Sequence, residues 1–175
     1  MLIFLDTEFT DLTDDAALIS LGIVTEEMST FYAETHASNW QTEASNFVRQ
    51  HVVPQLTGCT EDRMAIAHRL RSWLLALDDK PAQLVIDSEH DWRQIWRLFD
   101  EHGGWPSSLA PQPIYFTPWS ASSFAVRDAA EFARTTFFAQ HGLMDHHALN
   151  DARALRASYL AAAKIGYAGA FLDQS

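Results

Sequence analysis

The chain has 175 residues, 47% of them hydrophobic, which predicts a globular protein with a single domain, spanning residues 1–175, and one hydrophobic core. No stretch approaches the roughly 18 to 20 apolar residues of a membrane span, and no basic segment precedes the short apolar start, so neither a transmembrane helix nor a signal peptide is expected. The net charge of −11 argues against binding nucleic acid through a broad basic surface. It is compatible with a metal-dependent enzyme, because bound cations offset acidic side chains.

Cysteine use points to a reducing environment. Cys59 is the only cysteine, which excludes an internal disulfide and a cysteine-based zinc cluster. Together with the missing signal peptide, this fits a cytoplasmic protein, which is the location that we expect.

The first part of the chain is predicted to form three strands. Residues 1–9 are mostly apolar and end in acidic residues, while residues 16–24 and 28–34 are rich in β-forming side chains. The intervening Thr25-Glu26-Glu27 indicates an antiparallel hairpin. The sequence therefore predicts three successive strands at the start of the fold.

Helices are expected to follow over residues 44–56 and 60–77. Thr60 is the expected N-cap of the second helix. Apolar residues recur along it at helical spacing, and four of them are expected in the core: Met64, Leu70, Trp73 and Leu74.

The remaining elements alternate between strand and helix. The pattern predicts a strand at 83–86, a helix at 92–101, a Gly- and Pro-rich loop at 102–113, a strand at 114–117, and helices at about 121–140 and 148–165. Strands first, then helices alternating with strands, indicate an α/β fold with a mixed sheet flanked by helices.

Asp6 and Glu8 at the end of the first strand are the most informative residues. Side chains two positions apart on a strand point to the same face, so the two carboxylates can converge on one cation. A divalent cation relieves their repulsion and their loss of hydration, and oxygen ligands suit Mg²⁺ or Mn²⁺. Alternatively, the two acids are solvated turn residues that follow a strand.

Two other acidic segments lie at element boundaries. Asp87-Ser88-Glu89-His90-Asp91 follows the predicted strand at 83–86, and Asp145 to Asp151 precedes or opens the last helix. The three acidic segments could therefore meet at one edge of the sheet.

Three motifs occur in order: DTEF near the start, an Asp opening a mid-chain helix, and HHALNDA late in the chain. With these motifs the chain resembles the DEDDh family of 3′–5′ exonucleases, whose fold is ribonuclease H-like. The last motif matches the family's His-x-Ala-x-x-Asp pattern. The segments DTEFT, LISLGIV, FVRQHVVPQL and DSEHDW are most similar to small bacterial exoribonucleases.

The resemblance implies a fold, a cofactor and a catalytic set. The sheet would continue with parallel strands after its antiparallel start, and the site would bind two Mg²⁺ or Mn²⁺ ions. His146 would be the general base, and the metal ligands, which are also catalytic residues, would be Asp6, Glu8, Asp91 and Asp151. Two such ions polarise a phosphodiester, while an unligated histidine, which titrates near neutrality, accepts the proton of water.

The sequence leaves two of these assignments open. Asp87 is an alternative to Asp91, although a helix-capping role is expected for Asp87. His147 is an alternative to His146, because residues four apart share a helix face and His147 is four before Asp151. The family places its histidine on the loop before the helix, which favours His146.

Expected substrate-binding residues are Thr7, Phe9 and Trp92. In the family, the main chain around the first motif holds the 3′-terminal nucleotide and an apolar side chain stacks on its base, as aromatic side chains do on single-stranded bases. Phe9 could equally belong to the core, and Trp92 is chosen for its place beside Asp91. Four arginines in the last two helices could meet phosphates, although solvation is the default role of each: Arg127, Arg134, Arg153 and Arg156.

The function implied by the resemblance is hydrolysis of RNA from its 3′ end, releasing nucleoside 5′-monophosphates. Alternatives are a DNA exonuclease, a phosphodiesterase of small oligonucleotides, and a non-catalytic nucleic-acid-binding module. The expected partners are single-stranded or frayed 3′ ends, and a homodimer is possible by analogy with similar enzymes.

Overall fold

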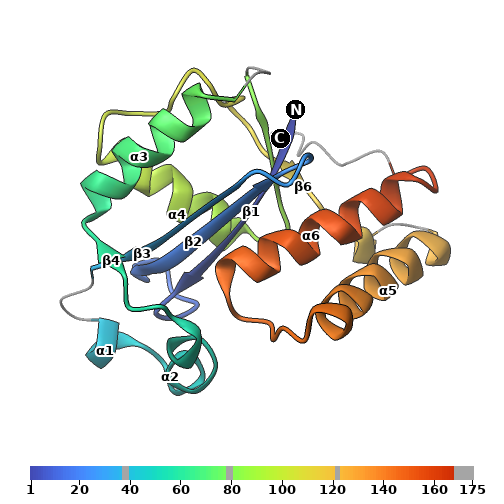
Figure 1. The fold of residues 1–175 in the computed structure, drawn as a ribbon, viewed down its shortest axis with the longest axis horizontal. Coiled ribbons are helices and arrows are strands. Elements are labelled where there is room, and N and C mark those ends of the chain that lie inside the picture. The colour runs from blue at the N-terminus through green and yellow to red at the C-terminus, as the bar shows by residue number, and fades with distance from the viewer. Residues whose placement is uncertain (37–39, 78–80, 121–122, 168–175) are drawn as a thin grey trace.

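The computed structural model describes residues 1–36, 40–77, 81–120 and 123–167. In this part of the chain, six strands form one mixed sheet in the order β4-β3-β2-β1-β5-β6 (Figure 1). The strands are β1 (Leu2–Phe9), β2 (Leu18–Thr25), β3 (Thr30–Thr35), β4 (Thr60–Glu61), β5 (Gln83–Ile86) and β6 (Ile114–Tyr115). The predicted mixed sheet is confirmed: β1, β2 and β3 are antiparallel neighbours, and β5 and β6 continue parallel to β1.

Helices cover both faces of the sheet. They are α1 (Trp40–Glu43), α2 (Asn46–His51), α3 (Arg63–Leu75), α4 (Glu89–Asp100), α5 (Phe124–His141) and α6 (Ala148–Ala163), with short 3₁₀ turns at Val53–Gln55 and Pro118–Ser120. Figure 1 shows α3 and α4 on one side of the sheet and α5 and α6 on the other. The architecture is therefore a three-layer α/β arrangement.

Successive side chains of β1 point to opposite faces of the sheet, so β1 contributes to the apolar layer on each face. Ile3 and Leu5 face one layer and pack in a cluster with residues of α3 and α4. Phe4 faces the opposite layer, where it packs with residues of α5 and α6. All three side chains are fully buried, so β1 is a central strand with an apolar layer on each face.

Three local predictions are wrong at helix starts. Thr60 is not a helix N-cap, because Thr60–Glu61 pairs with the end of β3 and the N-cap position of α3 is occupied by Asp62, whose side chain makes no hydrogen bond to the helix. Met64 is 59% exposed rather than buried, because the buried face of α3 is formed by Ile66, Ala67, Leu70 and Leu74. Helix α4 begins at Glu89, three residues before the predicted start, because Ser88 caps it.

Other predicted boundaries shift by less. The helix expected over 44–56 divides into α2 and a 3₁₀ turn, at a point where Pro54 cannot donate a helical hydrogen bond. The helix expected from about residue 121 begins at Phe124, because the backbone of Ser123, its N-cap residue, is extended; residues 121–122 lie outside the described part of the chain. Among the described helices, none combines the length and apolar character needed to cross a membrane.

Candidate metal centre

A first group of three carboxylates forms where β1 meets α6. Asp6 and Glu8 lie on the same face of β1, as their spacing predicts, and Asp151 comes from the first turn of α6. One oxygen from each of the three side chains lies within 4.8 Å of the others. The group is the right size to hold a cation.

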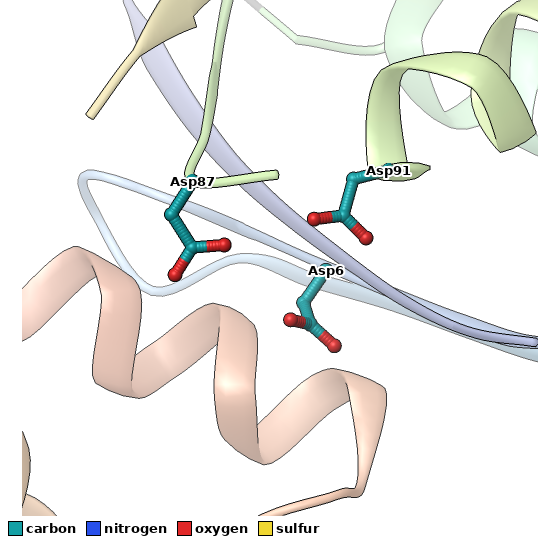
Figure 2. Close-up of side chains that lie close together, drawn as sticks. All are labelled: Asp6, Asp87 and Asp91. Carbon is teal, nitrogen blue, oxygen red and sulfur yellow. The ribbon is translucent and has the colours of Figure 1, made fainter. Parts of the chain in front are cut away.

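A second group shares Asp6 with the first. Asp6, Asp87 and Asp91 also bring oxygens within 4.8 Å of one another. Figure 2 shows the three side chains converging from β1, from the segment after β5 and from the first turn of α4. The five acids thus form two overlapping triads with Asp6 in common.

The strand register explains the place of Asp87. Phe4 pairs with Val85 in the parallel β1–β5 ladder, so two further residues along each strand bring Asp87 beside Asp6. Paired residues of neighbouring strands point to the same face of a sheet. The expected capping role of Asp87 is wrong, because the Ser88 side chain caps α4 by accepting a hydrogen bond from the His90 N–H.

Asp91 is held in place by Thr7. The Thr7 backbone N–H and its hydroxyl group both donate to Oδ1 of Asp91, at 2.9 and 2.6 Å, and both residues are buried. The main chain that the resemblance would direct to a nucleotide therefore positions an acid instead. These bonds leave Oδ2 of Asp91 available toward the centre.

Helix α6 brings Asp151 close to the sheet because Gly22 has no side chain. A Cβ atom on Gly22 would lie 2.3 Å from the backbone nitrogen of Leu149, in the first turn of α6. Asp151 itself accepts hydrogen bonds from the His147 N–H at 3.0 Å and from Nη2 of Arg134 at 2.7 Å. The carboxylate is thereby fixed at the start of the helix.

Crowding of acids raises their pKa values. Burial raises the pKa of Asp6 well above its usual range, and the negative charges of Asp91 and Asp151 add to the effect. Burial, with repulsion from Asp151, raises the pKa of Glu8 to about 8. Burial and the charge of Asp87 raise the pKa of Asp91, against the hydrogen bonds from Thr7. A bound divalent cation would remove this repulsion.

Asp87 differs from its neighbours in exposure. The residue as a whole is solvent-exposed, whereas Asp91 is buried, but the carboxyl group of Asp87 is turned in toward those of Asp6 and Asp91 (Figure 2). Loss of hydration at its carboxyl group raises the pKa of Asp87, while the positive charge of Arg134 opposes the shift.

The centre forms one side of a cavity of about 560 Å³. All five acids line the cavity, together with Arg134 and His146. The rest of its wall is largely apolar and comes from β1, the loop after it and α2: Phe9, Leu12, Phe47, Val48 and Val52. A ligand with an anionic part and a flat apolar part fits both sides of such a cavity.

The two candidate histidines lie in different surroundings. The His146 ring lines the cavity and makes an edge contact with Phe47, with ring centres 4.8 Å apart. The His147 ring stacks on Tyr32 at 4.8 Å, and His147 is not among the described residues that line the cavity. His146 therefore has access to a ligand in the cavity.

The loop that carries His146 is bridged to the 3₁₀ turn at Val53–Gln55. The Gln55 side-chain amide donates to the carbonyl oxygens of Asp145 and His146 at 2.6 and 3.1 Å, and to that of His51 at 2.8 Å. His146 has a φ of 66°, a left-handed conformation that is unfavourable for a residue with a side chain. The hydrogen bonds of Gln55 thus support a strained segment.

Two of the predicted substrate-binding residues lie at the cavity and one does not. Thr7 and Phe9 line it, and the Phe9 ring stacks on His90 with centres 5.4 Å apart. Trp92 instead packs against Trp96 and Trp105 and lines a separate hollow beside α4.

Of the four arginines in α5 and α6, only Arg134 is among the described residues that line the cavity. Arg156 donates to the backbone carbonyls of Thr25 and Glu26, and Arg127 lies over the ring of Phe124.

Sequence reasoning missed the contributions of Gly22 and Gln55, and it named Arg134 as a possible phosphate contact without finding its ion pair with Asp151. Nothing local to these residues indicates their roles, which depend on segments distant in the sequence. The sequence kept Asp87 only as an alternative to Asp91, whereas the structure brings both carboxylates to Asp6, an arrangement that depends on the β1–β5 register.

Comparison of the chain with known protein families and with curated proteins finds no match. What the protein does must therefore be inferred from the side chains of the site.

Proposed function

We propose that the protein is a metal-dependent 3′–5′ exoribonuclease with a ribonuclease H-like fold, of the DEDDh type that its sequence motifs resemble. The observation that carries the proposal is the pair of carboxylate triads that share Asp6. Two cation positions with one bridging acid suit two-metal hydrolysis of a phosphodiester. The direction of cleavage and the preference for RNA rest on the resemblance alone.

The residues fit Mg²⁺ or Mn²⁺. The donors are all carboxylate oxygens, which hard divalent cations prefer, and a cation would relieve the burial and mutual repulsion that raise the pKa values of Asp6 and Glu8. One ion would be held by Asp6, Glu8 and Asp151. The other would be held by Asp6, Asp87 and Asp91. Bound there, the ions would polarise the phosphodiester and stabilise the negative charge that develops on it.

The other residues of the cavity would orient the substrate and move a proton. Phe9 and Phe47 offer aromatic faces to a base, which makes binding tolerant of sequence. Water attacks the phosphorus, the bond to the 3′ oxygen breaks, and a nucleoside 5′-monophosphate leaves. His146, which lines the cavity and belongs to no triad, would accept the proton of the attacking water.

The test is a trimming assay with a 5′-labelled oligoribonucleotide and Mg²⁺ or Mn²⁺. We expect stepwise shortening from the 3′ end that EDTA and Asp6→Asn abolish. Asp128→Asn is the matched control, because it neutralises an exposed aspartate on α5. Shortening by pure Asp6→Asn protein would refute the mechanism, and an equal-length DNA arm tests the preference for RNA.

A second candidate is a phosphodiesterase of small oligonucleotides. The cavity volume of about 560 Å³ favours it, because pockets of this size enclose most of a small ligand. Activity that collapses between substrates of two and ten nucleotides would identify this function, and equal activity would identify a general exoribonuclease.

A further inference from the structure

Arg134 occupies an unusual place in the metal centre. Its guanidinium donates to Oδ1 of Asp151 at 2.7 Å, and the Asp151 side chain is only 7% exposed. Arg134 is the one arginine or lysine among the described residues that line the cavity. It therefore provides the positive charge nearest to Asp151 in a site built from five acids.

The bond between Arg134 and Asp151 competes with a cation. Oδ2 of Asp151 already accepts the His147 N–H at 3.0 Å, so Oδ1 is the oxygen with the more exchangeable partner. A divalent ion between Glu8 and Asp151 would attract Oδ1 and weaken its bond to Arg134. Binding of the ion would thus free guanidinium N–H groups of Arg134.

The freed guanidinium would stay at the cavity. Arg134 extends from the middle of α5 and lies over the ring of Phe138, with 5.1 Å between its Cζ atom and the ring centre. Its charge also acts on Asp87, on the other side of the centre. Helix and ring contact together hold the guanidinium near both triads.

We propose that Arg134 exchanges Asp151 for a phosphate oxygen of a nucleotide when the cation binds. A guanidinium suits both partners, because its planar N–H groups match carboxylate and phosphate geometry. The exchange makes cation and nucleotide binding mutually reinforcing, so that the site assembles fully only with both. Arg134 is then a phosphate-binding residue of the site, and this inference rests on the proposed function.

The experiment is calorimetric titration of Mn²⁺ into the full chain, alone and with saturating adenosine 5′-monophosphate, with adenosine as the phosphate-free control. For the unaltered protein we expect the nucleotide to tighten Mn²⁺ binding by about tenfold, a typical coupling between sites, and adenosine to have no effect. Arg134→Gln should bind Mn²⁺ alone about two- to fivefold more tightly, the effect of losing a partly exposed ion pair. The nucleotide should no longer tighten it.

Two variants serve as controls. Arg127→Gln removes the same charge from α5 two turns away and should match the unaltered protein. Arg134→Lys keeps the positive charge but lacks the planar N–H groups of a guanidinium, so the nucleotide should tighten Mn²⁺ binding less than in the unaltered protein. If Arg134→Gln does not fold, Arg134→Lys tests the proposal in its place.

The outcomes separate this inference from the proposed function. If the protein binds Mn²⁺ but Arg134→Gln retains the full coupling, or binds Mn²⁺ alone more weakly, the role of Arg134 is wrong and the metal centre stands. If the unaltered protein binds no Mn²⁺, the proposed function fails, and this inference fails with it.

Discussion

Asp6 and Gly22 lie directly opposite each other in the β1–β2 ladder, and the missing side chain of Gly22 is what lets α6 approach Asp6. A Cβ on Gly22 would lie 2.4 Å from the backbone carbon of Ala148, a distance that requires the helix to move. One glycine on a central strand therefore sets the spacing between Asp6 and Asp151, which belong to different elements.

Gly22→Ala should move Asp151 away from Asp6 and Glu8 and so disrupt one of the two triads. The added methyl group displaces the start of α6 and should destabilise the fold by about 1 to 3 kcal/mol, as overpacking does. Asp151 moves with the helix, so Mn²⁺ affinity should fall on the order of tenfold, as when support of a metal ligand is lost. Thermal unfolding in EDTA and calorimetric titration of Mn²⁺ measure the two effects.

Leu160→Ala is the matched control for this variant. Leu160 packs at the other end of α6, so its truncation should lower stability without moving Asp151. If Leu160→Ala weakens Mn²⁺ binding as much as Gly22→Ala does, the effect reflects loss of stability and not the approach at Gly22.

Asp87 and Asp91 should contribute unequally to one cation site. Both converge on Asp6, but Asp91 is buried and fixed by Thr7, whereas Asp87 is exposed. We expect Asp91→Asn to eliminate one of two Mn²⁺ equivalents in calorimetry and Asp87→Asn to weaken the same equivalent. If Asp87→Asn loses this Mn²⁺ equivalent and Asp91→Asn keeps it, Asp87 is the main ligand of the site and Asp91 the weaker one.

Stability of the metal-free protein should decrease as the pH rises. The pKa of Glu8 is raised from 4.5 to about 8 by burial and neighbouring acids, so the folded state binds a proton more tightly than the unfolded state does. The unfolded chain releases this proton near pH 4.5, whereas the folded protein keeps it until about pH 8. The free energy of unfolding therefore falls across this interval and levels off above it.

Glu8→Gln tests this pH dependence. The variant has no charge at position 8, so in EDTA its unfolding midpoint should fall less between pH 5 and 8 than that of the unaltered protein. Glu27→Gln, in the exposed turn after β2, should behave like the unaltered protein. Mg²⁺ should recover stability most at the upper end of the interval, and identical slopes for all three proteins would contradict the electrostatic account.

Local patterns in the sequence are sufficient to predict five of the six described strands and the first carboxylate pair. The strand at residues 2–9 and the period of two place Asp6 and Glu8 on one face, and the structure confirms this. The two-residue strand β4 could not be predicted, because it forms only by pairing with the distant end of β3. The place of Asp87 likewise depends on the β1–β5 register, which no local pattern encodes.

His146 and His147 should have separable effects. His146 lines the cavity, so His146→Ala should lower kcat by about 10² to 10⁴, the usual contribution of a general base, with Mn²⁺ affinity preserved. His147 stacks on Tyr32, so His147→Ala should cost about 1 kcal/mol of stability and change kcat little. Single-turnover assays and thermal unfolding on both variants check this, and a larger kcat effect in His147→Ala would exchange the roles.

Gln55 should affect catalysis through His146 without contacting substrate. Its amide is bonded to three carbonyl oxygens and holds the left-handed backbone at His146, so Gln55→Ala should let the loop relax and misplace the imidazole. Misplacement of a catalytic group by about 1 Å can cost up to a hundredfold in rate, and we expect kcat to fall at least tenfold. KM and Mn²⁺ affinity should change little, because the triads and the apolar wall are unaltered.

A second glutamine provides the comparison for Gln55. Gln83 also donates its side-chain amide to a backbone carbonyl, that of Gln112, at 2.6 Å, but it lies at the start of β5, at the opposite end from Asp87. Gln83→Ala therefore removes the same chemistry away from the site and should leave kcat unchanged. If Gln55→Ala and Gln83→Ala have equal kcat, the loop that carries His146 keeps its conformation without the hydrogen bonds of Gln55. The first turn of α6 would then be enough to hold His146 in its left-handed conformation.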